Sequence, residues 1–285
     1  LLGICLTGLP LIFADEIGQL LDDAPAYPQM PASTPRVDLD ILVARAKTAY
    51  PGQIVRSMYF PDDEPAAVLV MAPSQDADDK FDHDITYDAR TGLEHRRDAD
   101  GHPLTFMDVM RHVHEDLFLE LPGELFLALM SVLFLAAIVS GIVLYGPFMR
   151  RVAFGTLRRS ARLKWLDLHN LLSAVTLLWA GVIGITGFIN ELSTPLFGLW
   201  MATDVRESLA PYANRPFPAE LSSVSAAVRT VEGRMPDRKV ASVVFPTRHF
   251  GSPHHYVIWT QGNTVLTSRI FTPTLVDAGS GDYSF

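Results

Sequence analysis

The 285-residue chain is 48% hydrophobic and 19% charged and carries a formal net charge of −9. This mixture is typical of membrane-spanning helices joined to soluble parts, and the acidic balance argues against nucleic acid as a partner. The single cysteine, Cys5, excludes a disulfide framework or a thiolate metal cluster within one chain.

The N-terminal part combines an apolar segment with a proline-rich linker. Residues 1–14 are expected to be the end of a first transmembrane helix, because about 13 apolar residues are too few to span a bilayer alone. Residues 15–32 contain Pro25, Pro28 and Pro31 and are interpreted as an extended linker. The apolar start without Met, and an end inside a predicted domain, indicate a fragment truncated at both ends.

Residues 33–103 are predicted to form a first small α+β domain. A helix over residues 37–50 should stop at Pro51 and Gly52. The strands expected after it cover residues 53–60, 66–72 and 82–87. The first domain is therefore predicted to be a helix followed by a small antiparallel sheet.

Two long apolar runs follow and are joined by a basic loop. Residues 104–149 contain an amphipathic helix (residues 104–121) and a second transmembrane helix, and residues 165–203 contain a third one followed by an interfacial segment. The loop at residues 150–164 has basic but no acidic residues. By the positive-inside rule this loop is cytoplasmic, and both soluble regions lie on the other side of the membrane.

Residues 204–285 are predicted to repeat the first domain. A helix is expected at 221–235, with strands at 240–245, 255–260 and 264–271. Pro51 and Pro61 align with Pro236 and Pro246 without a gap, which indicates an internal duplication. Because each copy of about 70 residues is small for an independent core, each is expected to pack on the membrane or on the other copy.

Two histidines stand out against these apolar segments. His114 lies on the apolar stripe of the amphipathic helix, whereas His112 falls on the opposite, solvated side. His169 begins the next apolar run, and small residues continue its helical face. Small residues let another backbone or a flat ligand approach closely. The members of this face are Ser173, Thr176, Ala180, Gly184 and Gly187, and all but Ala180 are candidate haem contacts.

The two histidines are predicted to lie near opposite membrane surfaces and so cannot ligate one metal ion. We interpret each as an axial ligand of its own haem b, since neutral imidazole binds haem iron. Each haem would need a second ligand from a helix outside this segment. Three alternatives stay open: a polar tip among the head groups for each histidine, helix packing for the two glycines, and a solvated turn or a metal site for a further cluster of His249, His254 and His255.

Several segments resemble the PepSY-associated transmembrane family. The end of its first helix is matched by Leu6-Thr7-Gly8-Leu9-Pro10-Leu11-Ile12-Phe13-Ala14-Asp15-Glu16-Ile17. The second helix is matched by His114-Glu115-Asp116-Leu117-Phe118 and by Ser140-Gly141-Ile142-Val143-Leu144-Tyr145. The third is matched by Asp167-Leu168-His169-Asn170-Leu171-Leu172 and by Gly184-Ile185-Thr186-Gly187. The two soluble repeats are similar to the family's PepSY domains.

The resemblance implies a membrane α-helical bundle plus α+β, with four helices and two periplasmic PepSY domains, in the bacterial inner membrane. Some members pass electrons through two haems b to ferric siderophores. Carried over, His114 serves the outer haem and His169 the inner one. The partners so implied are a ferric siderophore or another ferric chelate, an unidentified electron donor and membrane lipid. The segment Asn170-Leu171-Leu172-Ser173 departs from the family, where many members have a basic residue and a glycine.

Two other functions are weighed against a haem-dependent reductase. A membrane anchor without enzyme activity, whose PepSY domains bind or inhibit a periplasmic peptidase or sensor, predicts no haem. A permease or assembly factor for iron or copper needs polar groups along an ion path, and both long apolar runs lack charged residues in their interiors.

Overall fold

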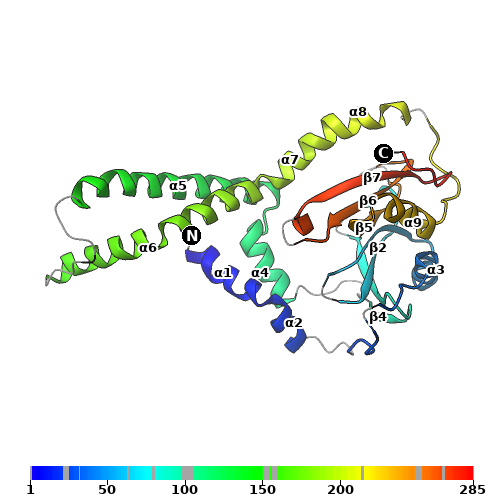
Figure 1. Ribbon diagram of the computed structural model, residues 1–285, viewed down its shortest axis with the longest axis horizontal. Helices are drawn as coiled ribbons and strands as arrows, with labels where there is room; N and C mark the ends of the chain where they lie inside the picture. Colours follow the sequence, from blue (N-terminus) through cyan, green and yellow to red (C-terminus); the bar gives the residue numbers. More distant parts are fainter. Residues whose placement is uncertain are drawn as a thin grey trace. The chain divides into compact units, whose positions relative to one another are not determined.

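The computed structural model divides into two units, each built from segments far apart in the chain (Figure 1). The helical unit comprises Leu1–Leu21 and Leu104–Glu207, and the sheet unit comprises Asp22–Pro103 and Ser208–Phe285. The structure describes residues 2–21, 26–31, 33–62, 64–78, 81–97, 105–149, 155, 160–212, 215–247, 252–264 and 267–284. Most of the predicted basic loop therefore lies outside the described residues.

The helical unit is dominated by two long apolar helices that lie side by side, α5 (Leu121–Met149) and α6 (Ala161–Glu191) (Figure 1). Within them, Leu121–Leu144 and Arg162–Glu191 have mean hydropathies of 2.7 and 2.0 and are long enough to cross a membrane. Only 11% and 6% of their most apolar windows are buried. Such exposure is unlike the core helix of a soluble protein, whose apolar face is covered.

Shorter helices complete this unit, and one of them occupies the start of the segment that we predicted to be a linker. α1 (Leu2–Ile12) packs on α4 (Phe106–Glu115). α2 (Ala14–Leu21) is helical where we predicted the linker to begin, and residues 26–31 lie in no helix or strand. After α6 come α7 (Ser193–Trp200), a π-helical turn at Met201–Val205, α8 (Arg206–Leu209) and a 3₁₀ turn at Ala210–Tyr212.

The amphipathic helix ends earlier than predicted, at Glu115. Its start is set by a capping box, in which Thr105 and Asp108 each satisfy the other's backbone N–H. Its end is set by Leu117, Phe118 and Glu120, which all have left-handed φ angles of 53–60°. Gly123 lies so close to this turn that a Cβ atom would overlap the carbonyl oxygen of Asp116. The chain therefore bends before Pro122 and not at it.

The sheet unit contains one antiparallel sheet of seven strands in the order β4-β3-β2-β1-β5-β6-β7. The first copy supplies α3 (Leu39–Ala49), β1 (Ile54–Tyr59), β2 (Ala66–Ala72), β3 (His83–Asp88) and β4 (Glu94–Arg97). The second supplies α9 (Val224–Arg234), β5 (Arg238–Val244), β6 (His255–Gly262) and β7 (Phe271–Asp277). Each copy contributes the predicted helix and antiparallel strands, but the strands form one shared sheet and not two small separate sheets.

The two copies meet at β1 and β5 in a two-fold arrangement. Met58 pairs with Val243, its own equivalent in the gap-free alignment, and the flanking pairs are symmetric about it. Each of these strands also carries a bulge at the equivalent position, after Val55 in β1 and after Val240 in β5. An extra residue in a strand reverses the alternation of sides. This is why Val55 and Met58, three residues apart, both face the core.

Helices α3 and α9 cover one face of the sheet and share one apolar core with it. The core includes Leu42 from α3, Val231 from α9, and Met58 and Val243 at the two-fold pair, all with no more than trace exposure to solvent. Burying a side chain of this size contributes about 1.5–3 kcal/mol. Because the core crosses the boundary between the copies, neither copy encloses it alone.

The N-termini of α3 and α9 cap each other across this boundary. The Leu39 N–H donates to Ser225 Oγ at 2.8 Å, and the Val224 N–H donates to Asp40 Oδ1 at 2.9 Å. Ser225 in turn donates its hydroxyl to Asp38, the N-cap of α3, at 2.7 Å. The first N–H groups of a helix have no partner within it. Each copy therefore supplies an acceptor for an N–H group of the other copy's helix, in addition to the helices' own N-caps, Asp38 and Ser223.

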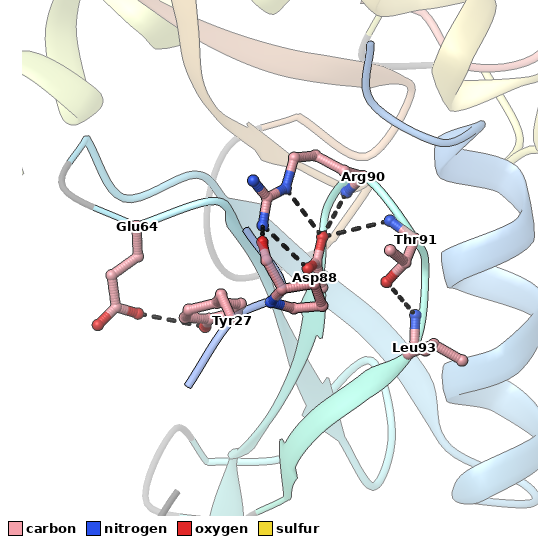
Figure 2. Close-up of polar contacts among 7 residues, drawn as sticks. Tyr27, Glu64, Asp88, Arg90, Thr91 and Leu93 are labelled. Atoms are coloured by element: carbon pink, nitrogen blue, oxygen red, sulfur yellow. Dashed lines mark hydrogen bonds and ion pairs between the residues drawn. The ribbon is translucent and has the colours of Figure 1, made fainter. Parts of the chain in front are cut away.

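The turn after β3 also ties the linker to the first copy (Figure 2). Asp88 accepts hydrogen bonds from the backbone N–H groups of Arg90 and Thr91 and pairs with the Arg90 guanidinium at 3.2 Å. The same guanidinium donates to the Pro28 carbonyl at 3.0 Å, and the Tyr27 hydroxyl donates to Glu64 at 3.2 Å. The extended linker is thus held against this domain.

The structure differs from the sequence prediction at two places in the sheet. We predicted a strand at 264–271, but this region contains a 3₁₀ turn at Thr267–Arg269, and β7 begins only at Phe271. The hydroxyls of Thr264 and Thr267 accept from each other's backbone N–H groups, which favours a turn over a strand. Strand β4 was not predicted, because its sequence Glu94-His95-Arg96-Arg97 has no apolar alternation.

We predict that Ser225→Ala lowers the free energy of unfolding of the sheet unit by about 1–3 kcal/mol, because the buried Leu39 N–H loses its acceptor. Urea unfolding of the full chain in detergent should be followed by the fluorescence of Trp259, with Trp165, Trp179 and Trp200 replaced by Phe. Thr48→Ala is the control, since its hydroxyl bonds only within α3. Equal losses in the two variants would contradict the reciprocal cap.

Candidate functional site

His114 is held between two helices of the helical unit. It lies on α4, and its Nδ1 is 3.1 Å from the hydroxyl oxygen of Thr7 on α1. His112, two residues earlier, points elsewhere: its side chain is 46% exposed and its Nδ1 lies 3.2 Å from Asp116 Oδ2. The structure therefore separates the two histidines as the helical periodicity predicts, with His114 on the packed side.

The approach of His114 to α1 depends on a missing side chain. A Cβ atom at Gly8 would lie 2.9 Å from His114 Cε1 and 3.7 Å from its Nε2. Carbon atoms do not approach so closely without a shift of one of them. Gly8 is thus the position that allows the imidazole to reach Thr7. The sequence analysis did not identify either residue as part of the site.

His169 has a different environment at the other end of the unit. It is exposed on α6, and so are Ser173 and Thr176, the next members of its face. The Thr176 hydroxyl donates to the Leu172 carbonyl at 2.9 Å, so it is satisfied within its own helix. The first half of the predicted small-residue face is therefore open to a ligand or to another helix.

The second half of this face is closed by α5. A Cβ atom at Gly184 would lie 2.8 Å from Leu135 Cδ2 and 3.1 Å from Phe134 Cδ1, and Gly187 faces Ser131. Gly184 is about 22 Å along the helix axis from His169, given a rise of about 1.5 Å per residue. The structure thus places Gly184 and Gly187 in helix packing, the alternative considered above, and leaves His169, Ser173 and Thr176 as the open part.

The sheet unit contains a histidine pair that we had considered a solvated turn. That interpretation is wrong for the two members that the structure describes, because His254 is 6% exposed and His255 0%. His255 Nδ1 lies 2.9 Å from Ser252 Oγ, and the Tyr212 ring meets its edge at 4.4 Å. Among the described residues nothing hydrogen-bonds its Nε2. His249, the third member, lies outside the described residues.

The metal alternative for this cluster finds no support in the described part of the chain. No group of three or more His, Cys, Asp or Glu side chains that could hold a metal ion occurs among the described residues. Burial lowers the pKa of His255, and the neighbouring His254 and Arg215 act in the same direction, whereas Asp277 opposes them. A buried, neutral imidazole next to a buried serine is a structural pair at neutral pH.

Comparison with known proteins supports the membrane assignment. A family model described as the PepSY-associated TM region matches residues 1–268. Uncharacterized protein PA4219 of Pseudomonas aeruginosa is 29% identical over 86 residues, which represent 30% of this chain and 22% of that protein. This chain therefore matches less than a quarter of that relative. The family match and the two apolar helices lead to the same conclusion, that this is a membrane protein.

We predict that Gly184→Ala destabilises the contact between α5 and α6 by about 1–3 kcal/mol, the usual cost of an added carbon in a packed site. Thermal unfolding in detergent, followed by circular dichroism, should show a lower midpoint. Gly181→Ala is the matched control, since no atom of another described residue is found within 4 Å of its Cβ position. It should unfold at the same or a higher temperature because alanine favours the helix. A Gly184→Ala midpoint as high as that of the control would show that the glycine is not needed for packing.

The stability of the sheet unit should fall as the pH drops below about 6.5, the value for histidine in an unfolded chain. Because the folded pKa of His255 is lower, the unfolded state binds a proton first, and the loss continues until the folded pKa is reached. Urea unfolding at several pH values, followed by the fluorescence of Trp259, measures how the free energy of unfolding changes with pH. His255→Gln should weaken this dependence, whereas His95→Gln should keep it. A dependence that is unchanged in His255→Gln would rule out His255 as its source.

Proposed function

Because this chain belongs to the PepSY-associated TM family, we propose that it is a haem-dependent reductase of the bacterial inner membrane. In this proposal His114 is an axial ligand of an outer haem b and His169 of an inner one. The substrate is a ferric chelate such as a ferric siderophore on the periplasmic side. The basic loop at residues 150–164 supports this orientation, since such loops stay in the cytoplasm.

The observation that carries the proposal is how His114 is held. Haem-ligating histidines bind iron through one ring nitrogen while the other is fixed by a hydrogen bond. His114 matches this pattern, because its Nδ1 contacts Thr7 and its ring is half-buried between α4 and α1. The donor set fits one axial imidazole for each haem, with the second ligand coming from elsewhere.

The open part of α6 fits the second site in a different way. His169, Ser173 and Thr176 are exposed along about two turns of an apolar helix, with no bulky side chain among these three. A flat macrocycle could lie against such a surface and bury it from lipid and water. Gly184 and Gly187 contribute indirectly, since they bring α5 close and so fix the position of the helix.

Bound haem would carry one electron at a time from a cytoplasmic or quinol donor to one Fe(III) of the chelate, which becomes Fe(II). The chain's own residues ligate the iron, hold the imidazoles and keep water from the apolar interior. Hard oxygen ligands prefer Fe(III) to Fe(II), so the reduction loosens the chelate. The iron is then available for uptake.

We predict that the full chain, purified in mild detergent after expression with a haem supply, shows reduced b-type bands at about two haems per chain. His114→Ala and His169→Ala should each lose about half of the haem, since each removes one axial ligand. His112→Ala is the matched control, because His112 is exposed on the same helix as His114. Optical spectra before and after dithionite, with a pyridine haemochrome assay, measure the content.

A folded, haem-supplied preparation without these bands would overturn the reductase and favour the membrane anchor that binds a periplasmic peptidase or sensor. Full haem content in both histidine variants would overturn the assignment of the ligands. If the bands are present, mixing the reduced protein with a ferric chelate should reoxidise it and release Fe(II), which a ferrous-specific dye detects.

A further inference from the structure

The Thr7 side chain is bonded on two sides. Its hydroxyl oxygen lies 3.1 Å from the Gly3 carbonyl oxygen, 3.2 Å from the Ile4 carbonyl oxygen and 3.1 Å from His114 Nδ1. A hydroxyl has one proton to donate and two lone pairs to accept with. A carbonyl oxygen can only accept. The imidazole nitrogen donates or accepts according to the tautomer of the ring.

Counting protons decides between the two tautomers. If Thr7 donates to a carbonyl of its own helix and accepts from His114 Nδ1–H, the group makes two hydrogen bonds. If Thr7 instead donates to a bare Nδ1, the group makes only one hydrogen bond. The Thr7 oxygen then faces the carbonyl oxygens without a proton between them. Threonine hydroxyls in apolar helices commonly donate to carbonyls three or four residues back. Two bonds in series also strengthen each other.

We infer that Thr7 is a positioning residue that fixes His114 as the Nδ1–H tautomer. The lone pair of the ring is then on Nε2, the atom available to an electrophile such as haem iron. This inference rests on the proposed function for the identity of that electrophile, but the tautomer follows from the contacts alone. A hydrogen bond from Nδ1–H to Thr7 would also make Nε2 a stronger electron-pair donor to a haem iron, and this would stabilise Fe(III) over Fe(II).

Gly8 leaves the space on α1 that this contact needs. Because Gly8 has no Cβ, the Cε1 edge of the His114 ring can come close to α1, and Nδ1 lies 3.1 Å from the Thr7 oxygen. Thr7 and Gly8 therefore act together: Thr7 accepts the hydrogen bond from Nδ1–H, and Gly8 leaves space for the ring. Thr186-Gly187 on α6 repeats the same dipeptide, and the Thr186 hydroxyl bonds the Val182 carbonyl at 2.9 Å and the Ile183 carbonyl at 3.3 Å. Thr186 thus provides a matched threonine for a control.

The first test measures the tautomer without haem. In the full chain, labelled with ¹⁵N-histidine and kept in detergent, the His114 signal is identified by its loss in His114→Gln. We expect a protonated Nδ1 and a bare Nε2, and we expect Thr7→Val to lose this preference, Thr7→Ser to keep it and Thr186→Val to leave it unchanged. A His114 that carries its proton on Nε2 in the unmodified chain would overturn the inference, whatever the haem content.

The second test measures the consequence for the haem. Redox titration of the haem-loaded chain should show that Thr7→Val raises the midpoint potential of the haem lost in His114→Ala and leaves the other unchanged. Thr7→Ser should restore the lower potential, and Thr186→Val should have no effect. Equal shifts of both haems, or none, would contradict a positioning role for Thr7. If no haem binds, the proposed function fails, and the tautomer measurement still decides the inference.

Discussion

The pairing of β1 with β5 is the interaction on which the sheet unit depends. Each copy alone has about 70 residues, too few to bury a large core. The pairing places Met58 against Val243 and brings α3 and α9 onto one face of a common sheet. The reciprocal caps follow from the same two-fold relation, because each helix N-terminus then faces its equivalent. Duplication has thus produced one folded unit and not two domains in series.

A different constraint governs the helical unit: the apolar surface of each helix must be covered by lipid or by another helix. Along the small-residue face of α6 both outcomes occur. Gly184 and Gly187 allow α5 to pack closely, whereas the turns around His169 keep the same small residues without a covering helix among the described residues. One sequence pattern therefore contains a packing segment and an open segment, and only the contacts distinguish them.

Hydrophobic periodicity predicted much of this structure, and its failures have physical causes. The strands with alternating apolar residues, the duplication marked by Pro51 and Pro236, and the inward face of His114 were predicted. Strand β4 was missed because a polar edge strand has no alternation. The burial of His255 was missed because it depends on Tyr212 and Ser252. The Thr7–His114 contact joins residues 107 positions apart, and no local pattern reports such a pair.

The geometry of His114 bears directly on whether it is an anchor or a ligand. An amphipathic histidine at a membrane surface points its polar atoms toward the head groups and water. His114 instead turns its Nδ1 toward a neighbouring helix, where it lies 3.1 Å from the Thr7 hydroxyl oxygen, and packs its ring against Gly8. Fixing a ring in this way costs side-chain entropy, and the contact between α4 and α1 offsets part of that cost. In the proposed function the fixed ring has a second use, because a metal bond requires one nitrogen to stay bare and in place.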